Sequence, residues 1–407
     1  MKKSSEYLQS MFKKLCGTAL FSATVLLSTS CGPGESNPLR KEAQSSVDSV
    51  EIPQTPVENQ NRVGFCWAYA VIGLVESDYK FRTGEALQLS EEAMGFYRMV
   101  EGLYYLTQNL RGQELSDNIM QDTFQGWLLK SDEIPDSFDL LKTYGVVPES
   151  VWKVKFESEE SIDGLVKVIR RAMNRLVFNT IDPRTITRAQ IIEKVLLAPG
   201  AWQSAPPQEF SLKGIKYTPQ SYLDSLEFDP MAFESVVTNR PEDVEKVIRA
   251  TKRALVRGIS VPLGFPVNFD RLKADTFTGK GVDLKNGENF FRDGGHAVLI
   301  DDWVNKGSVP GALPLQQIVQ EFLRPTLDLD YLVFKNSWGT DAKMNEAGVV
   351  VSGSPTGYYK MDREYLVGSA NMSASPEFQG MLEVVVPADI ALNPFGDEPV
   401  NPEVSER

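Results

Sequence analysis

A single histidine and one well-placed cysteine are the residues of this chain that could form a nucleophile and its base. The sequence holds one histidine, His296, and three cysteines, of which only Cys66 lies beyond the first 31 residues. A thiolate is the nucleophilic form of cysteine, and an imidazole within hydrogen-bond reach can take the thiol proton. With one imidazole and one such thiol, the chain can build this pair in a single way. We therefore predict that Cys66 is a catalytic nucleophile and that His296 is its acid and base.

Composition argues against two other kinds of chemistry. A zinc site usually needs three or four cysteine, histidine or carboxylate ligands at short spacings, and the sequence contains no such cluster. The formal net charge is −13, whereas a nucleic-acid surface needs a stripe of basic residues. We therefore expect no metal, no cofactor and no nucleic-acid partner.

A buried helix is predicted directly after Cys66, from Cys66 to about Arg82, with Gly84 as its stop. The apolar residues at helical spacing are Trp67, Ala70, Val71, Leu74 and Val75. Cys66 falls in the first turn, where free backbone N–H groups and the helix dipole stabilise a thiolate. A cysteine before an apolar helix is, taken alone, more often a small core residue, so the interpretation depends on its neighbours.

A predicted strand with alternating apolar residues ends at an amide side chain, that of Asn336. The segment that begins at Tyr331 reads Tyr-Leu-Val-Phe-Lys-Asn-Ser-Trp-Gly, and Asn336 lies at the end of the strand. The segment resembles the asparagine segment of papain-like cysteine peptidases, and the resemblance implies that the amide oxygen of Asn336 accepts a hydrogen bond from the imidazole and fixes its tautomer and orientation. Trp338 would shield that bond from water. Taken alone, Asn-Ser-Trp-Gly would also suit a simple turn after a strand.

Residues 60–70, Gln-Asn-Arg-Val-Gly-Phe-Cys-Trp-Ala-Tyr-Ala, resemble the active-site segment of papain-like cysteine peptidases. The resemblance implies that the side-chain amide of Gln60 and the backbone N–H of Cys66 donate to the oxyanion of the tetrahedral intermediate. It also implies a thiolate–imidazolium pair at neutral pH, since the thiol pKa of papain's pair is roughly 3 to 4. Two residues depart from the family pattern. Val63 stands where a disulfide cysteine is common, and Phe65 replaces a small residue and could narrow access to the cleft.

Further segments follow in the order of the same family, namely residues 89–92, 144–149, 294–299 and 331–339. The resemblance implies an α+β, papain-like two-lobe fold with a catalytic cleft between the lobes. A helical lobe would carry Cys66, and an antiparallel β-barrel-like lobe would carry His296 and Asn336. The implied reaction is amide hydrolysis through a thioester, with a peptide or protein as substrate.

The spacing between Cys66 and His296 predicts an insertion. The two residues lie about 230 positions apart, compared with roughly 130 to 150 in compact papain-like enzymes. We expect a helical insertion at about 153–240. Four segments resemble the bleomycin hydrolase and aminopeptidase C branch of the family: residues 206–210, 217–222, 357–362 and 382–386. In that branch the C-terminus lies in the cleft and makes the enzyme an aminopeptidase, often within a hexamer. About twenty polar residues follow the last segment here, so we carry over neither feature.

The two ends of the chain indicate export and flexibility. Residues 1–30 read as a signal peptide, with four early lysines before an apolar stretch too short to span a bilayer. The residues before Cys31 resemble a bacterial lipobox, although Ser28 stands where leucine is usual. Cys31 would then be lipidated as a membrane tether; ordinary cleavage nearby would leave it a spare thiol. We expect a flexible tether at 31–51, a peptidase domain at 52–387 and a disordered tail at 388–407.

The sequence thus predicts an exported cysteine peptidase, periplasmic or attached to the outer membrane of a bacterium as a lipoprotein. Two alternatives stay open. One is a catalytically silent papain-fold scaffold or binding lipoprotein, and the other is an amidase that acts on cell-wall peptides. The choice between endopeptidase and aminopeptidase, the oligomeric state and the means of control are also open, and no inhibitory propeptide is evident.

Overall fold

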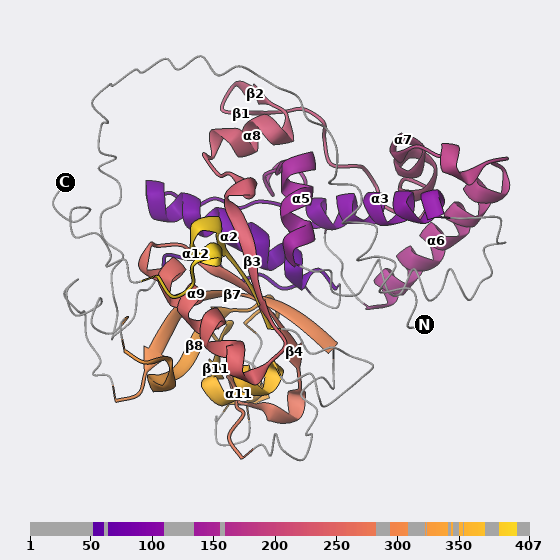
Figure 1. Cartoon of the computed structure of the whole chain (residues 1–407). Coiled ribbons are helices and arrows are strands. Elements are labelled where there is room, and N and C mark those ends of the chain that lie inside the picture. The colour runs from indigo at the N-terminus through magenta and orange to yellow at the C-terminus, as the bar shows by residue number, and fades with distance from the viewer. Residues whose placement is uncertain are drawn as a thin grey trace, which may run out of the picture. The chain divides into compact units, whose positions relative to one another are not determined.

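A helical layer and a large β-sheet meet along the helix that begins at Cys66 (Figure 1). The structure is a computed structural model of the 407-residue chain, and its described residues all fall in one unit, residues 39–407. The described residues are 52–60, 64–109, 134–154, 159–281, 294–307, 322, 324–340, 343–344, 350–352, 354–370 and 382–396. The predicted signal peptide, Cys31 and the tether to residue 51 therefore lie outside the described residues. Among those described, no helix is both long and apolar enough to cross a membrane.

The helical layer is built around α2 (Cys66–Thr83), which packs against α3 (Glu91–Asn109) and α5 (Ile134–Tyr144). The first two-thirds of α2 are almost entirely buried, because apolar residues lie on every side of the helix. Its end is Gly84, which adopts a left-handed conformation with φ of 76° and donates its N–H to the Lys80 carbonyl. The predicted buried helix with a glycine stop is therefore confirmed.

The main sheet has eight strands in the order β3-β12-β4-β7-β8-β11-β6-β5. All neighbours pair antiparallel except β6 and β11, which run parallel. The strands are β3 (Phe233–Thr238), β4 (Val261–Val267), β5 (Leu272–Lys273), β6 (Thr276–Phe277), β7 (Gly294–Asn305), β8 (Leu329–Lys335), β11 (Tyr358–Asp362) and β12 (Leu382–Pro387). This mixed architecture confirms the predicted α+β fold, although the order of the described strands is open rather than closed into a barrel.

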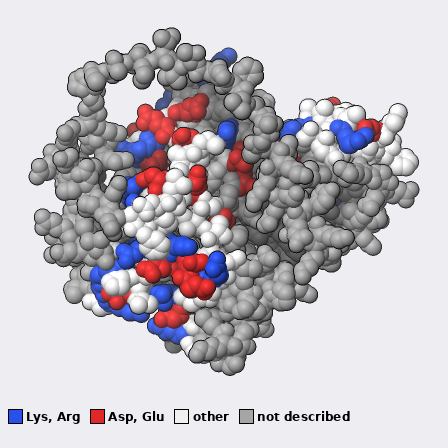
Figure 2. Space-filling model, in the orientation of Figure 1, with Lys and Arg blue, Asp and Glu red and all other residues white. Residues whose placement is uncertain are grey.

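One face of the sheet is covered by α2 and the other by α9 (Val244–Val256). A 3₁₀ turn at Pro241–Asp243 opens α9, and its apolar side packs into a second core with the inner residues of β4, β7 and β12. The outer side of α9 carries ion pairs, such as Arg257 with Asp389 at 2.6 Å. Figure 2 shows basic and acidic side chains interspersed over the described part of one molecular face.

The predicted insertion holds several small elements that share a core with α2, α3 and α5, with α6 (Glu159–Phe178) as its longest helix. The others are η1 (Pro183–Thr185), α7 (Arg188–Ile191), the π-helical turn η2 (Ile192–Leu196), the hairpin β1 (Phe210–Leu212) and β2 (Ile215–Tyr217), α8 (Pro219–Ser225) and η3 (Pro230–Ala232). Trp152 and Trp202 stack with ring centroids 5.7 Å apart and are buried, so they act as packing anchors. The end of the predicted insertion needs a correction, because β3 pairs along its whole length with β12 of the main sheet.

The predicted disordered tail also needs a correction at its start. Residues Ala388–Leu392 form a short helix, α12, in which Ile390 is fully buried. Arg257 pairs with Asp389, and the guanidinium of Arg253 donates to the Asn393 carbonyl. Apolar burial and these two contacts hold the segment on α9, whereas the rest of the predicted tail, from residue 397, lies outside the described residues.

Candidate active site

Cys66 is the first residue of α2 and is 3% exposed. The backbone N–H groups of Ala297, of Trp67 and of Cys66 itself act on the sulfur and lower the pKa of the thiol. Burial has the larger effect and raises this pKa to about 11, because a thiolate loses its hydration inside the protein. The contact with Ala297 matters for the site, since Ala297 follows His296 directly on β7.

His296 lies on β7, and Asn336 directly follows the neighbouring strand β8. β7 pairs with β8, with Leu299 opposite Lys335, so both residues lie beyond that pair at the same end of the two strands. The distance from His296 Nε2 to Asn336 Oδ1 is 2.8 Å. An amide oxygen can only accept, so Nε2 carries the proton in this bond and Nδ1 is the acceptor nitrogen of the ring.

Aromatic rings enclose this hydrogen bond. The ring of Trp338 stacks on the imidazole of His296 with a centroid distance of 4.6 Å and an interplanar angle of 18°. Phe265 on β4 approaches the same imidazole edge-on at 5.9 Å. The enclosure leaves His296 only 6% exposed and Asn336 1% exposed. Burial lowers the pKa of His296 to about 4, although the bond to Asn336 acts in the opposite direction.

Gln60 is fixed to the segment that follows Asn336. Its backbone N–H donates to the Ser337 carbonyl at 2.8 Å, and the Ser337 hydroxyl donates to the Gln60 side-chain oxygen. Asn59 forms an antiparallel bridge with Trp338, and the Gly339 N–H donates to the Glu58 carbonyl. Because the oxygen of the Gln60 amide is held as an acceptor, its nitrogen is the end of the group that can donate to a substrate.

The structure thus places the four predicted site residues on four adjoining segments. Cys66 starts α2, His296 lies near the start of β7, and Asn336 follows β8 directly, beside the segment that carries Gln60. The arrangement contains an acceptor nitrogen for a thiol proton, a fixed imidazole and two donors for an oxyanion. Among the described residues, no group of three or more histidine, cysteine or carboxylate side chains could hold a metal.

Burial and packing bear on two expectations about this site. The resemblance implied a thiolate–imidazolium pair at neutral pH; burial acts against the charged forms, since it raises the pKa of Cys66 and lowers that of His296. Phe65 also does not narrow the cleft with its ring. The ring is 2% exposed and packs on α3 so closely that a Cβ added to Gly95 would lie 2.2 Å from it.

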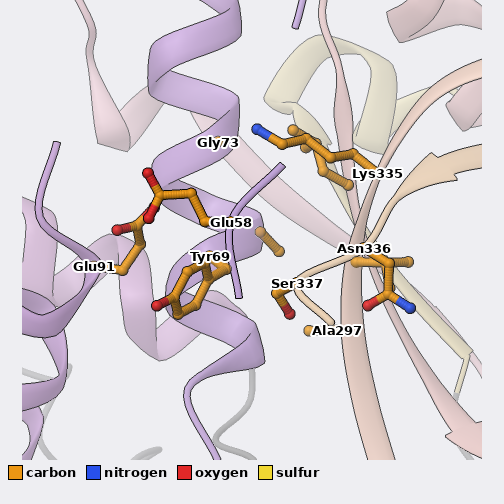
Figure 3. A pocket seen from close by; sticks show the side chains of 11 residues that line it. Glu58, Tyr69, Gly73, Glu91, Ala297, Lys335, Asn336 and Ser337 are labelled. Carbon is orange, nitrogen blue, oxygen red and sulfur yellow. The ribbon is translucent and has the colours of Figure 1, made fainter. Parts of the chain in front are cut away.

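A small pocket of about 20 Å³ lies beside this site, between α2 and the β7–β8 pair (Figure 3). Glu58, Tyr69, Glu91, Lys335 and Asn336 are among the residues that line it. Sequence reasoning missed this pocket. Glu91 and Lys335 stood within segments that resemble the family, but nothing in their spacing indicates that a carboxylate of α3 meets a lysine of β8.

A chain of hydrogen bonds connects the pocket to a buried carboxylate. Lys335 Nζ donates to Thr55 Oγ1 at 2.8 Å, and that hydroxyl donates to Glu76 Oε2 at 2.5 Å. The Leu89 N–H donates to the other oxygen of Glu76 at 2.7 Å. Burial nevertheless raises the pKa of Glu76 to about 7, and burial also raises the pKa of Glu91 well above its usual range. Burial lowers the pKa of Lys335.

Comparison with known proteins bears on the fold and on the family. PepW from Lactobacillus rhamnosis, a solved structure, superposes with a TM-score of 0.57 at 14% identity, covering 87% of this chain and 84% of PepW. That likeness shows the fold. The sequence model of the Peptidase C1-like family matches residues 12–212, a range that includes Gln60 and Cys66. The chain belongs to the papain-like C1 peptidase family.

Curated relatives of this C1-family protein match over shorter stretches. Aminopeptidase C of Listeria monocytogenes is 26% identical over 133 residues, which are 31% of this chain and 30% of that protein. Ananain of Ananas comosus is 39% identical over 67 residues, which are 13% of this chain and 19% of ananain. The aligned stretches thus span less than a third of either relative. The branch resemblance seen in the sequence is supported by the match to aminopeptidase C.

Proposed function

We propose that this protein is an exported cysteine peptidase that hydrolyses peptide bonds through a thioester on Cys66. One observation carries the proposal. The imidazole of His296 is hydrogen-bonded to Asn336 under the ring of Trp338, and the next backbone N–H along the strand acts on the sulfur of Cys66. A nucleophile, a base and a group that orients the base form the constellation expected of acyl transfer.

The reaction would proceed in two halves. The sulfur of Cys66 attacks the peptide carbonyl, and its proton passes to Nδ1 of His296. The oxyanion accepts hydrogen bonds from the Cys66 backbone N–H and the Gln60 amide. His296 then protonates the leaving amine as the C–N bond breaks, which leaves a thioester. Water attacks the thioester with His296 as base, and the acid product and the free thiol are released.

Burial of the pair favours one order of events. Because burial raises the pKa of Cys66 and lowers that of His296, transfer of the thiol proton would accompany the attack rather than precede it. The hydrogen bond to Asn336 supports this step, since it holds Nε2 protonated and keeps Nδ1 as the acceptor. An imidazolium formed during attack would be stabilised by the same amide oxygen.

Export and membrane attachment belong to the same proposal and are supported by the sequence alone. The leader at 1–30 would direct the protein out of the cytoplasm, and lipidated Cys31 would tether it to a membrane. Mass spectrometry of the mature N-terminus tests this directly. A diacylated or triacylated Cys31 that is lost in Cys31→Ser would support the tether, whereas an unmodified N-terminus elsewhere would contradict it.

A peptide library tests the activity. Wild type and Cys66→Ala would be incubated with the library under reducing conditions, and the product ends would be mapped by mass spectrometry. Internal cuts that vanish in the variant establish an endopeptidase, and stepwise N-terminal trimming establishes an aminopeptidase. Release of peptides only from cell-wall fragments would favour the amidase alternative. Absence of all cleavage, with no labelling of Cys66 by a thiol-directed electrophile, would favour the silent scaffold.

A further inference from the structure

The outer face of α6 carries a row of basic side chains that ends in two apolar ones. Lys167, Arg171 and Arg175, here called the basic stripe, are exposed, as is Phe178. Their spacing of three or four residues places all four on one face of the helix. Phe178 is 90% exposed, and Ile181, three residues further on, is fully exposed. Among the described residues, no other large apolar side chain is as exposed as these two.

The opposite face of α6 fixes the helix to the rest of the molecule. Leu165, Ile169, Met173 and Leu176 are buried and belong to the core that also contains residues of α2, α3 and α5. The basic stripe therefore lies on the outside of a firmly packed helix. Substitutions in the stripe remove charge from the surface without removing a core contact.

The charge of this region has the opposite sign to that of the whole chain. Residues 164–200 hold seven lysine and arginine residues and two acidic ones, whereas the chain has a net charge of −13. Arg188 pairs with Glu101 at 2.6 Å, but within the described part of the chain no carboxylate pairs with the basic stripe. The acidic residues of α6 all lie in its first five positions, which suits the helix dipole. The dipole does not account for two apolar side chains in water at the other end.

An open groove of about 850 Å³ extends the same surface from α6 to the π-helical turn η2. Arg175 and Ile181 line it, and Lys194 of η2 adds a further exposed basic residue. The apolar side chains in the groove are Ala172, Leu176, Leu197 and Ala198. Figure 2 shows, at its upper right, basic side chains beside a mostly uncharged surface. Basic and apolar groups thus lie together over more than one element.

This combination matches the chemistry of a bilayer surface. Anionic head groups attract lysine and arginine side chains, and apolar side chains enter the boundary between head groups and acyl chains. We propose that the basic stripe, together with Phe178 and Ile181, binds the surface of an anionic phospholipid bilayer. The inference depends neither on peptidase activity nor on lipidation of Cys31. With a lipidated Cys31, this contact would determine which side of the protein faces the membrane.

Flotation with lipid vesicles tests the inference. The mature protein, from residue 31 and carrying Cys31→Ser, would be used, because the leader or an acyl group would bind a bilayer by itself. One set of vesicles would contain phosphatidylcholine alone, and the other would contain phosphatidylcholine mixed with phosphatidylglycerol. We expect binding to the mixed vesicles only, with a partition constant that falls as salt is added, because salt screens exposed charges.

Two variants separate the basic from the apolar contribution. The triple variant Lys167→Gln, Arg171→Gln and Arg175→Gln should lower the partition constant about a hundredfold, since each basic residue near an anionic surface contributes roughly fivefold. The double variant Phe178→Ser and Ile181→Ser should lower it roughly tenfold, because the apolar side chains no longer enter the boundary region.

Matched controls make the same changes elsewhere on the surface. The triple variant Lys216→Gln, Lys273→Gln and Lys280→Gln removes the same charge at exposed positions outside α6. Leu392→Ser removes an apolar side chain that is 79% exposed. Both controls should keep the partition constant within about twofold of wild type. Thermal unfolding followed by circular dichroism would check that every variant is folded.

Several outcomes would overturn the inference. One is a wild type that does not bind the mixed vesicles, and another is a stripe variant that binds no more weakly than its control. Self-association of wild type without vesicles, lost in the Phe178 and Ile181 double variant, would instead assign the surface to a second copy of the chain. Equally tight binding of soluble polyglutamate would assign it to an acidic polypeptide. Failure of the peptide-library assay would overturn the proposed peptidase and leave this inference standing.

Discussion

The two sides of α2 keep polar groups away from water in different ways. On the catalytic side, Cys66 faces the His296–Ala297 step of β7, and burial favours neutral forms of both titratable groups. On the pocket side, Glu76 and Glu91 are buried with Lys335 nearby, and burial raises the pKa values of both carboxyls. The catalytic side relies on hydrogen bonds and ring stacking. On the pocket side, burial shifts the pKa values of the carboxyl groups above their usual range.

This difference between the two sides of α2 indicates which side controls activity and which contributes to stability. Catalysis requires the proton to move between two groups that are held in place, and the Asn336 bond and Trp338 provide that restraint without a fixed charge. The pocket side contributes to the junction of helix and sheet through buried polar bonds, which are costly to leave unmade. Changes on the catalytic side should therefore affect rate more than stability, and changes in the pocket should do the reverse.

The largest effect is expected from Gln60→Ala. Loss of an oxyanion donor should lower kcat/KM by about 10²- to 10³-fold, while the free energy of unfolding changes by less than about 1 kcal/mol. Steady-state kinetics and urea denaturation would measure the two quantities. The exposed Gln208 provides the matched control, because Gln208→Ala should leave kcat/KM unchanged. A loss in Gln60→Ala smaller than threefold would show that this side chain does not act on the oxyanion.

The next effect concerns the pH dependence of stability. Burial raises the pKa of Glu76 from 4.5 to about 7, so the folded protein holds this proton more tightly than the unfolded chain does. The contribution to stability is therefore fully present below about pH 4.5 and is lost as the pH rises through about 7. The free energy of unfolding of wild type should therefore fall between pH 5 and pH 7.5. We expect Glu76→Gln to reduce this fall by about 2 to 3 kcal/mol, measured by denaturation at the two pH values.

The control for Glu76 is Glu227→Gln, since the Glu227 side chain is 79% exposed and the substitution changes the same charge. Its pH profile should match that of wild type. If Glu76→Gln retained the full fall in stability between the two pH values, the carboxyl of Glu76 would not be the group that titrates there.

The smallest effect is expected from Thr55→Val. The substitution leaves the buried oxygen of Glu76 and the ammonium of Lys335 without their shared hydroxyl, which should cost about 1 to 2 kcal/mol of unfolding free energy at pH 7. Activity at a temperature well below the melting transition should stay within about twofold. Thr340→Val, at an exposed position, is the control. A tenfold loss of kcat/KM with unchanged stability would reverse the assignment of the two sides.

Local patterns predicted the elements that carry the site. Apolar residues at helical spacing and the glycine at 84 placed α2, and strict alternation before Asn336 placed β8. These features depend on short-range periodicity and turn chemistry, which the sequence displays directly. The meeting of His296 and Asn336 was also predicted, although from resemblance to a family rather than from spacing.

Tertiary packing decided what the sequence did not predict. The direction of the Phe65 ring depends on the absence of a side chain at Gly95 of α3, and the raised pKa of Cys66 depends on how completely the start of α2 is covered. The buried carboxyls and Lys335 come from separate segments that meet only in the fold. The short helix α12 is held by the burial of Ile390. The polar, proline-containing sequence around it does not indicate that this side chain is buried.

The acyl-enzyme itself gives the most direct test of the central claim that Cys66 is the nucleophile. Wild type would be mixed rapidly with an activated peptide ester, quenched in acid and analysed by intact mass and peptide mapping. We predict a mass increase equal to the acyl group on Cys66, which decays as product appears and is absent in Cys66→Ala. Turnover of the ester with no acyl group on Cys66, or equal turnover by Cys66→Ala, would contradict the account.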